Sequence, residues 1–373
     1  MNKVKEARPL LEVAEVFFKL GCTAFGGPAV HIAMMEKEVV GKRQWMTKEH
    51  FLDLVGATNL IPGPNSTEMT MHCGHERAGF PGLLVAGACF IFPAAILTGV
   101  LAWMYRHYGT LPEVQPFVYG IKPAIIAVIV FLMIGLGKKA LKTVALGIIG
   151  AVAAILVLAG FSEIVVLFGS GAAGILIHTI KQKAKRANSI TPIIILAVNH
   201  ISNAKLFWIF LKIGSVLYGS GYVLFAFLDD ALVSQGLLSK QQLVDAIAVG
   251  QFTPGPVFSS ATFIGWQIGG VKGALAATIG IFLPSFIFVA LLNPVIPRLR
   301  RSWIMSAFLD AVNIASVAII LAVIIEIGKT TLLDWRTILI ACIGFIVAYV
   351  FKNLNTAFII LGGSILGYLL TLF

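Results

Sequence analysis

Charged residues are scarce in this chain. Asp, Glu, Lys and Arg together make up 12% of its 373 residues, which is about half of the share found in soluble globular domains. Hydrophobic residues make up 58%, and the mean hydropathy is +0.93. This composition excludes an ordinary soluble domain and predicts an integral membrane protein.

Cysteine is scarce too. The chain has four cysteines, and their positions show no paired spacing: Cys22, Cys73, Cys89 and Cys342. We therefore expect no disulfide framework. The run of His72, Cys73 and His75 has no recognised ligand spacing on one helix, so we expect the polar end of a helix there and no metal site.

Several functional motifs are missing. The sequence contains no Walker loop and no Gly-x-Ser-x-Gly elbow, so nothing indicates ATP use, a hydrolase nucleophile or a cofactor, and we expect no enzyme. No small-residue cleavage site follows the basic segment MNKVKEARPL, so we expect the first helix to be retained. The net charge of +11 indicates basic cytoplasmic loops rather than nucleic-acid binding.

Long apolar runs are abundant. Segments 81–104, 114–136, 143–160 and 303–327 are each long enough to span a bilayer. The runs are continuous and lack the short alternating pattern of a membrane β-barrel. The sequence therefore predicts an all-α polytopic membrane protein.

The chain repeats itself. FFKLGCTAFGGP at 17–28 matches FLKIGSVLYGSG at 210–221, and TKEHFLDLVGATNLIPGP at 47–64 matches SKQQLVDAIAVGQFTPGP at 239–256. The offset between matched positions drifts only from 193 to 191. Such a duplication is typical of transporters. We predict repeats at 1–189 and 205–373, joined by a linking segment at 190–204.

Each repeat contains eight apolar segments. The first four are too short to span, and they pair into two hairpins, bent in the first repeat at 26–28 and 62–64; the other four are expected to cross the membrane. If the N-terminus is cytoplasmic and segment 190–204 crosses, nineteen of the 28 Lys and Arg residues are cytoplasmic and six are on the other side. The distribution of Lys and Arg between the two sides is reversed from one repeat to the other. We therefore predict inverted topology and an extracytoplasmic C-terminus, and whether 190–204 crosses stays open.

The breaks in the hairpins suggest a binding site. Proline removes a backbone donor, and non-helical backbone at membrane depth is tolerated only inside protein or beside a water-filled cavity. Each break also starts a helix, whose N-terminus offers free amides and partial positive charge to an anion. We expect the anion to contact residues at these breaks: Gly26, Gly27, Asn65, Ser66, Thr67, Ser259 and Ser260.

Three lysines lie within apolar segments. Lys19 and Lys212 occupy matching positions, seven residues before a glycine break. They either balance the charge of an anion or extend to the membrane surface. Lys122 precedes Pro123, which favours a kinked position facing a cavity, and we place Lys122 and Gln251 along the transport pathway.

Three carboxylates are candidates for proton coupling. Glu68 follows the first Pro-Gly-Pro break by one helical turn, so it should face the site, either as a cap or as a proton carrier. Asp53 and Asp245 match between the repeats. They either move protons or serve as paired or capping carboxylates.

The sequence resembles the chromate ion transporter family in its long, two-domain form. The resemblance extends over both repeats and rests on five motifs: FGGP (25–28), LIPGPNST (60–67), GFPG (79–82), FIFPAA (90–95) and QFTPGPV (251–257). It implies efflux of chromate across the bacterial inner membrane, driven by the proton motive force, with sulfate as a competitor. The family commonly has glutamine on both sides of the first Pro-Gly-Pro, where this chain has Asn59 and Glu68.

We predict a secondary transporter of a tetrahedral oxyanion. Its expected partners are chromate or sulfate, protons and the lipid bilayer, and a homodimer is left open. One alternative is uptake of sulfate or another inorganic anion. A second alternative is a membrane sensor that binds an anion without moving it. A complete duplication favours transport, because alternating access uses two opposed repeats.

Overall fold

Helices are the only secondary structure in the part of the chain that the structure describes. The structure, a computed structural model, describes residues 8–25, 27–109, 111–182, 203–218, 223–292, 302–352 and 354–372. This agrees with the predicted all-α fold. The linking segment at 190–204 lies outside the described residues except for its last two, which begin α8.

The first half of the chain forms α1 to α7. Their bounds are α1 (Pro9–Thr23), α2 (Pro28–Met35), the π-helix η1 (Glu36–Lys42), α3 (Lys48–Thr58), α4 (Asn65–Tyr108), α5 (Gln115–Ala140), α6 (Val144–Leu158) and α7 (Glu163–Gln182).

The second half repeats this order. Its bounds are α8 (Asn203–Val216), α9 (Val223–Leu228), the π-helix η2 (Asp229–Val233), α10 (Lys240–Phe252), the 3-10 turn η3 (Val257–Ser259), α11 (Ser260–Leu292), α13 (Trp303–Thr331), α14 (Trp335–Val350) and α15 (Thr356–Thr371). The matching helices α3 and α10 also start alike, because the side chains of Thr47 and Ser239 cap their first turns.

Helices α4 and α11 are each folded back on themselves. The backbone of α4 leaves the helical region at Ala78 and Gly79, where φ of Gly79 is +63°. The two arms are so close that a Cβ on Gly74 would lie 2.3 Å from the carbonyl oxygen of Gly82. Only glycine permits this approach. Gly265 and Gly273 make the equivalent contact in α11, again at 2.3 Å.

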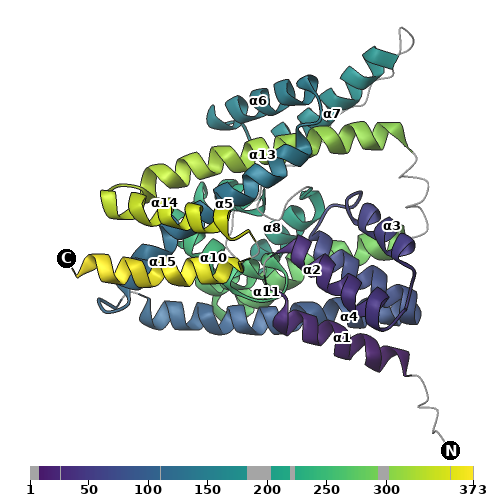
Figure 1. Ribbon diagram of the computed structural model, residues 1–373, viewed down its shortest axis with the longest axis horizontal. Coiled ribbons are helices and arrows are strands. Elements are labelled where there is room, and N and C mark those ends of the chain that lie inside the picture. Colours follow the sequence, from purple (N-terminus) through teal and green to yellow (C-terminus); the bar gives the residue numbers. More distant parts are fainter. Residues whose placement is uncertain are drawn as a thin grey trace, which may run out of the picture.

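Within the described residues, four helices are long and apolar enough to cross a membrane: α4, α5, the segment Val257–Leu291 that includes α11, and α13. Shorter apolar helices occur at Val144–Leu158, Glu163–Thr179, Trp335–Val350 and Thr356–Thr371. The chain is therefore built as a multi-pass membrane protein. Figure 1 shows α1 beginning near one end of the long axis and α15 ending near the other.

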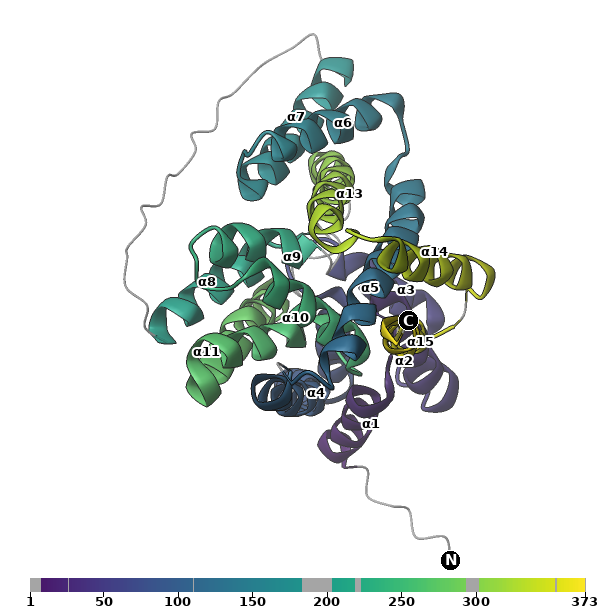
Figure 2. The ribbon, with the colours of Figure 1, turned by 90° about the vertical axis from the view of Figure 1, so that its left-hand side faces the viewer.

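The long helices of each half pack against the other half. Helix α5 packs on α14 and α15, whereas its counterpart α13 packs on α6 and α7. Figure 2 shows α13 between α6 and α7 on one side and α5 and α14 on the other. Within each half, α1 lies along α4 and α8 lies along α11. The two halves are thus interlocked in one helical bundle.

Polar contacts join the halves at two places. Lys142 Nζ lies 2.7 Å from Asp310 Oδ1. Near the start of α5, the Tyr119 hydroxyl donates to Asp334 Oδ2 at 2.5 Å. This hydrogen bond, together with the Thr337 amide, lowers the pKa of Asp334. Asp334 also caps α14.

Candidate functional site

Each Pro-Gly-Pro segment is hydrogen-bonded to the opposite half of the chain. The amide of Gly63 donates to the carbonyl of Leu217, and the amide of Gly255 donates to the carbonyl of Ala24, both at 2.8 Å. Ala24 and Leu217 directly follow α1 and α8 and occupy matching positions. The two reciprocal bonds satisfy non-helical amides within the bundle and hold both breaks at the junction between the halves.

The first break site consists of Gly63, Thr67, Glu68 and Ser285. Thr67 and Glu68 are fully buried in the first turn of α4. Ser285, from α11 in the other half, donates to Glu68 Oε1 at 3.2 Å. Within the described part of the chain, Thr67 Oγ1 and Glu68 Oε2 are buried without a hydrogen-bond partner. Buried polar atoms of this kind are costly and indicate a place for a proton, a water or a ligand.

The second break site consists of Thr98, Thr253, Ser259 and Ser260. Thr98, on α4, donates to Ser259 Oγ at 3.2 Å and approaches Thr253 Oγ1 at 3.5 Å. Ser259 and Ser260 are fully buried, and Ser260 Oγ has no partner among the described residues. This site is rich in hydroxyls and contains no carboxylate, which distinguishes it from the first break site.

The remaining predicted residues at the breaks lie beside these two sites. Asn65 donates to the Asn59 side chain at 2.8 Å, across the first break. Ser66 is buried next to Thr67. Gly27 has φ +82° and directly precedes α2. Gly26 and the break at 219–221 lie outside the described residues.

A buried charged triad lies near the second break site. It consists of Tyr105 on α4, Lys122 on α5 and Asp245 on α10. Lys122 Nζ is 3.6 Å from Asp245 Oδ1, and the Tyr105 hydroxyl donates to Asp245 Oδ2 at 2.6 Å. The side chains of Lys122 and Asp245 are only 13% and 5% exposed. Tyr105 and Thr98 are seven residues apart on α4, so the triad and the second break site are separated by about 10 Å.

The structure therefore brings Lys122 and Asp245 together, although the sequence assigned them separate roles. Gln251, on the same helix as Asp245, is 4% exposed. Asp53, which matches Asp245 in the repeat, is exposed on α3. The matched aspartates thus have different surroundings.

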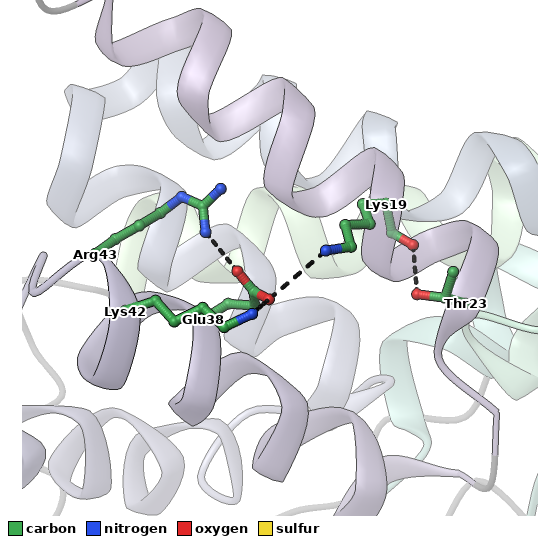
Figure 3. Close-up of polar contacts among 5 residues, drawn as sticks. All are labelled: Lys19, Thr23, Glu38, Lys42 and Arg43. Carbon is green, nitrogen blue, oxygen red and sulfur yellow. Dashed lines mark hydrogen bonds and ion pairs between the residues drawn. The ribbon is translucent and has the colours of Figure 1, made fainter.

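Lys19 belongs to a separate group that we call the Glu38 cluster: Lys19, Glu38, Lys42 and Arg43. Lys19 Nζ is 3.9 Å from Glu38 Oε1, and its side chain is 65% exposed. Lys42 lies 2.7 Å from the same oxygen, and Arg43 donates to Oε2 (Figure 3). The Lys42 hydrogen bond in particular lowers the pKa of Glu38. Lys212 is also exposed, so the charge-balancing role of both lysines stays a prediction.

Four polar residues at these sites escaped the sequence analysis: Thr98, Tyr105, Thr253 and Ser285. Thr98 and Tyr105 are spaced by seven residues, which places them on one face of a helix, but nothing in the sequence named their partners. Ser285 adjoins Pro284, the counterpart of Pro93. Among the described residues, no group of three His, Cys, Asp or Glu side chains could hold a metal ion.

Broken helices and buried hydroxyls inside an interlocked, apolar helical bundle are typical of membrane transport proteins. The chain belongs to the chromate transporter family, because the model of that family matches residues 11–175 and 204–368.

Named relatives cover nearly the whole chain. A probable chromate transport protein of Synechococcus elongatus is 30% identical, and the match covers 98% of this chain and 96% of the relative. A chromate transport protein of Cupriavidus metallidurans is 28% identical, with 96% and 92% covered. An uncharacterized transporter of Methanocaldococcus jannaschii is 26% identical, with 96% and 94% covered. No solved structure is significantly similar to the chain.

Proposed function

We propose that the protein is a secondary transporter of a tetrahedral oxyanion, chromate in the first place, with sulfate as a competitor. The observation that carries this proposal is the reciprocal placement of the two Pro-Gly-Pro segments, each bonded to the other half at 2.8 Å and each followed by buried hydroxyls. The names of the Synechococcus and Cupriavidus relatives support chromate as the substrate. Export from the cytoplasm, driven by the proton motive force, is the direction we propose.

The two halves are proposed to be inverted repeats, at 1–189 and 205–373. Two features support this. The contacts of α5 with α14 and α15 are mirrored by those of α13 with α6 and α7, and α1 begins at the opposite end of the bundle from the end of α15 (Figure 1). Inverted halves would place the N-terminus in the cytoplasm and the C-terminus outside, in the inner membrane of a bacterium.

The anion is proposed to bind at the second break site. Ser259, Ser260, Thr98 and Thr253 present hydroxyls that can donate to oxyanion oxygens, and α11 begins there with the positive end of its dipole. The unpartnered Ser260 hydroxyl is the donor that a ligand would satisfy. Helix dipoles alone are not enough to bind a dianion, because one helix terminus stabilises an anion by only about 0.3–2 kcal/mol.

Glu68 is proposed to be the proton-coupling carboxylate. It is fully buried, and its described partner is the single hydroxyl of Ser285. Burying an unpaired carboxylate charge is costly, so Glu68 is expected to gain and lose a proton as its surroundings change during transport. Asp245 is a second candidate, and it acts through its contact with Lys122.

Flux measurements on purified protein in proteoliposomes test the proposal. Radiolabelled chromate should move faster than in empty liposomes. Excess sulfate should slow it, and an imposed pH gradient should drive it against its own gradient until a protonophore is added. Flux without any response to the pH gradient would refute proton coupling, and equal flux with and without protein would refute transport.

A membrane sensor of oxyanions is the candidate from another class. It would bind chromate or sulfate to the detergent-purified protein with no flux in proteoliposomes. The interlocked packing of the two halves favours transport, because a binding role alone requires one half-site and not two matched ones.

A further inference from the structure

We propose that Tyr105, Lys122 and Asp245 form a closed gate on the C-terminal side of the bundle, and that the structure is open on the opposite side, next to α3. This inference rests on the proposed transport function and adds to it the residues that hold one side shut. Helices α3 and α10 occupy equivalent positions in the two repeats, but their surroundings differ.

The matching faces of α3 and α10 differ in exposure. Leu52 on α3 is 52% exposed, whereas its counterpart Val244 on α10 is 3% exposed. Asp53 is exposed, whereas Asp245 is buried. Asn59, directly after α3, is exposed, whereas its counterpart Gln251, near the end of α10, is buried. One face is therefore covered in the second half and uncovered in the first.

The cover over α10 comes from both halves. Helix α10 packs against α5 and α4 of the first half and against α15 of its own half. The main neighbours of α3 are α4 and η1. The counterparts of α5 and α15 are α13 and α7, and neither is among the main neighbours of α3 within the described residues. Two inverted halves in different states give this asymmetry, with one entrance closed and the other open.

The charged triad is the polar contact that holds α10 to its cover. Asp245 is bonded to α5 through Lys122 at 3.6 Å and to α4 through Tyr105 at 2.6 Å. Both side chains of the ion pair are largely shielded from solvent, so each charge is stabilised by its partner in place of water. The counterpart of Lys122 in the second half is Asn313, which has no charge, so the repeat does not supply a second Lys–Asp pair at the matching positions.

Other charged groups near α10 are paired among themselves. Lys240, at the start of α10, contacts Glu326 on α13 at 2.5 Å and Asp229 on η2 at 3.9 Å. Lys48 and Glu36 form the matching pair on the open side, at 3.0 Å. The pair of Lys240 with Asp229 is therefore matched on the open side, whereas the contact of Lys240 with Glu326 joins α10 to α13 on the closed side and acts there together with the triad.

Cysteine labelling tests the gate. In a background without the four native cysteines, single variants Leu52→Cys and Val244→Cys are purified in detergent, where both ends of the bundle face water, and exposed to a water-soluble maleimide. Leu52→Cys should react quickly and Val244→Cys slowly. Adding Lys122→Met or Asp245→Asn should speed the reaction of Val244→Cys about tenfold or more, since removing one partner of a buried ion pair strongly disfavours the closed state.

The matched position separates a gate from simple damage. If the triad locks one side, the same substitutions should slow the reaction of Leu52→Cys, because opening one entrance closes the other. The charge-swapped pair Lys122→Asp with Asp245→Lys should restore protection of Val244→Cys. Unchanged protection of Val244→Cys would overturn the gate, and so would faster labelling at both positions, which indicates loosened packing.

The labelling needs no substrate, so it is independent of the proposed activity. Loss of the gate pattern with intact chromate flux would overturn the gate and leave the transport function in place. The expected gate pattern without flux of chromate or sulfate would overturn the proposed substrates and leave the gate in place.

Discussion

Replacing Gly255 by alanine tests how closely the second Pro-Gly-Pro segment approaches the first half. Gly255 has φ +87°, and its amide donates to Ala24. A Cβ there would lie 2.9 Å from Ala94 Cβ and 3.2 Å from the carbonyl oxygen of Gly21. The backbone strain of a left-handed alanine costs about 1–2 kcal/mol. The crowding adds about 1–3 kcal/mol, because the neighbours must shift.

Gly270 provides the matched control. It has φ +59°, and a Cβ there would meet nothing within 4 Å. Gly270→Ala therefore has the strain without the crowding. We expect Gly255→Ala to unfold roughly 2–12 °C below Gly270→Ala in thermal melts of the detergent-purified protein, given about 2–4 °C per kcal/mol. Equal melting temperatures would refute the close contact between the halves at this break.

Three further outcomes are expected. Glu68→Gln should flatten the pH dependence of chromate flux while leaving the melting temperature near that of the wild type; identical pH profiles would remove Glu68 from coupling. Ser260→Ala should weaken sulfate binding about tenfold, the loss expected for a hydrogen bond to a charged group, whereas Ser215→Ala, whose hydroxyl bonds within α8, should not. The lowered pKa of Glu38 means that its ionised contacts stabilise the protein fully above the ordinary value of 4.5 and are lost as the pH falls through the lower folded value. The melting temperatures of Glu38→Gln and wild type should therefore differ at pH 7 and converge in strong acid, and a constant difference across the titration would contradict this account.

Much of the architecture follows from local sequence alone. Apolar runs of sufficient length form helices in a bilayer, because every backbone amide must be paired inside the segment. This predicted the all-helical, multi-pass fold, and the resemblance of five motifs separately indicated the family. Apolar segments also gave the order of elements in each half, and the structure describes helices in the same order in both halves. Thr47 and Ser239 cap matching helices because side-chain capping depends only on neighbouring residues.

Long-range contacts could not be predicted in this way. The partners of Gly63 and Gly255 lie in the opposite half, at Leu217 and Ala24, and no local pattern names them. The same is true of Ser285 beside Glu68. These contacts depend on how two complete halves interlock, which is a property of packing in three dimensions.

The sequence by itself determined which residues are polar within apolar segments, and it placed Asp53 and Asp245 at equivalent positions of the two repeats. Only the tertiary structure decided that they differ: Asp245 is buried against Lys122 and Tyr105, and Asp53 is exposed. The physical reason is that burial belongs to the assembled bundle. A buried carboxylate requires a cation and a donor from other helices, and α5 and α4 supply them to α10, whereas the main neighbours of α3 are α4 and η1.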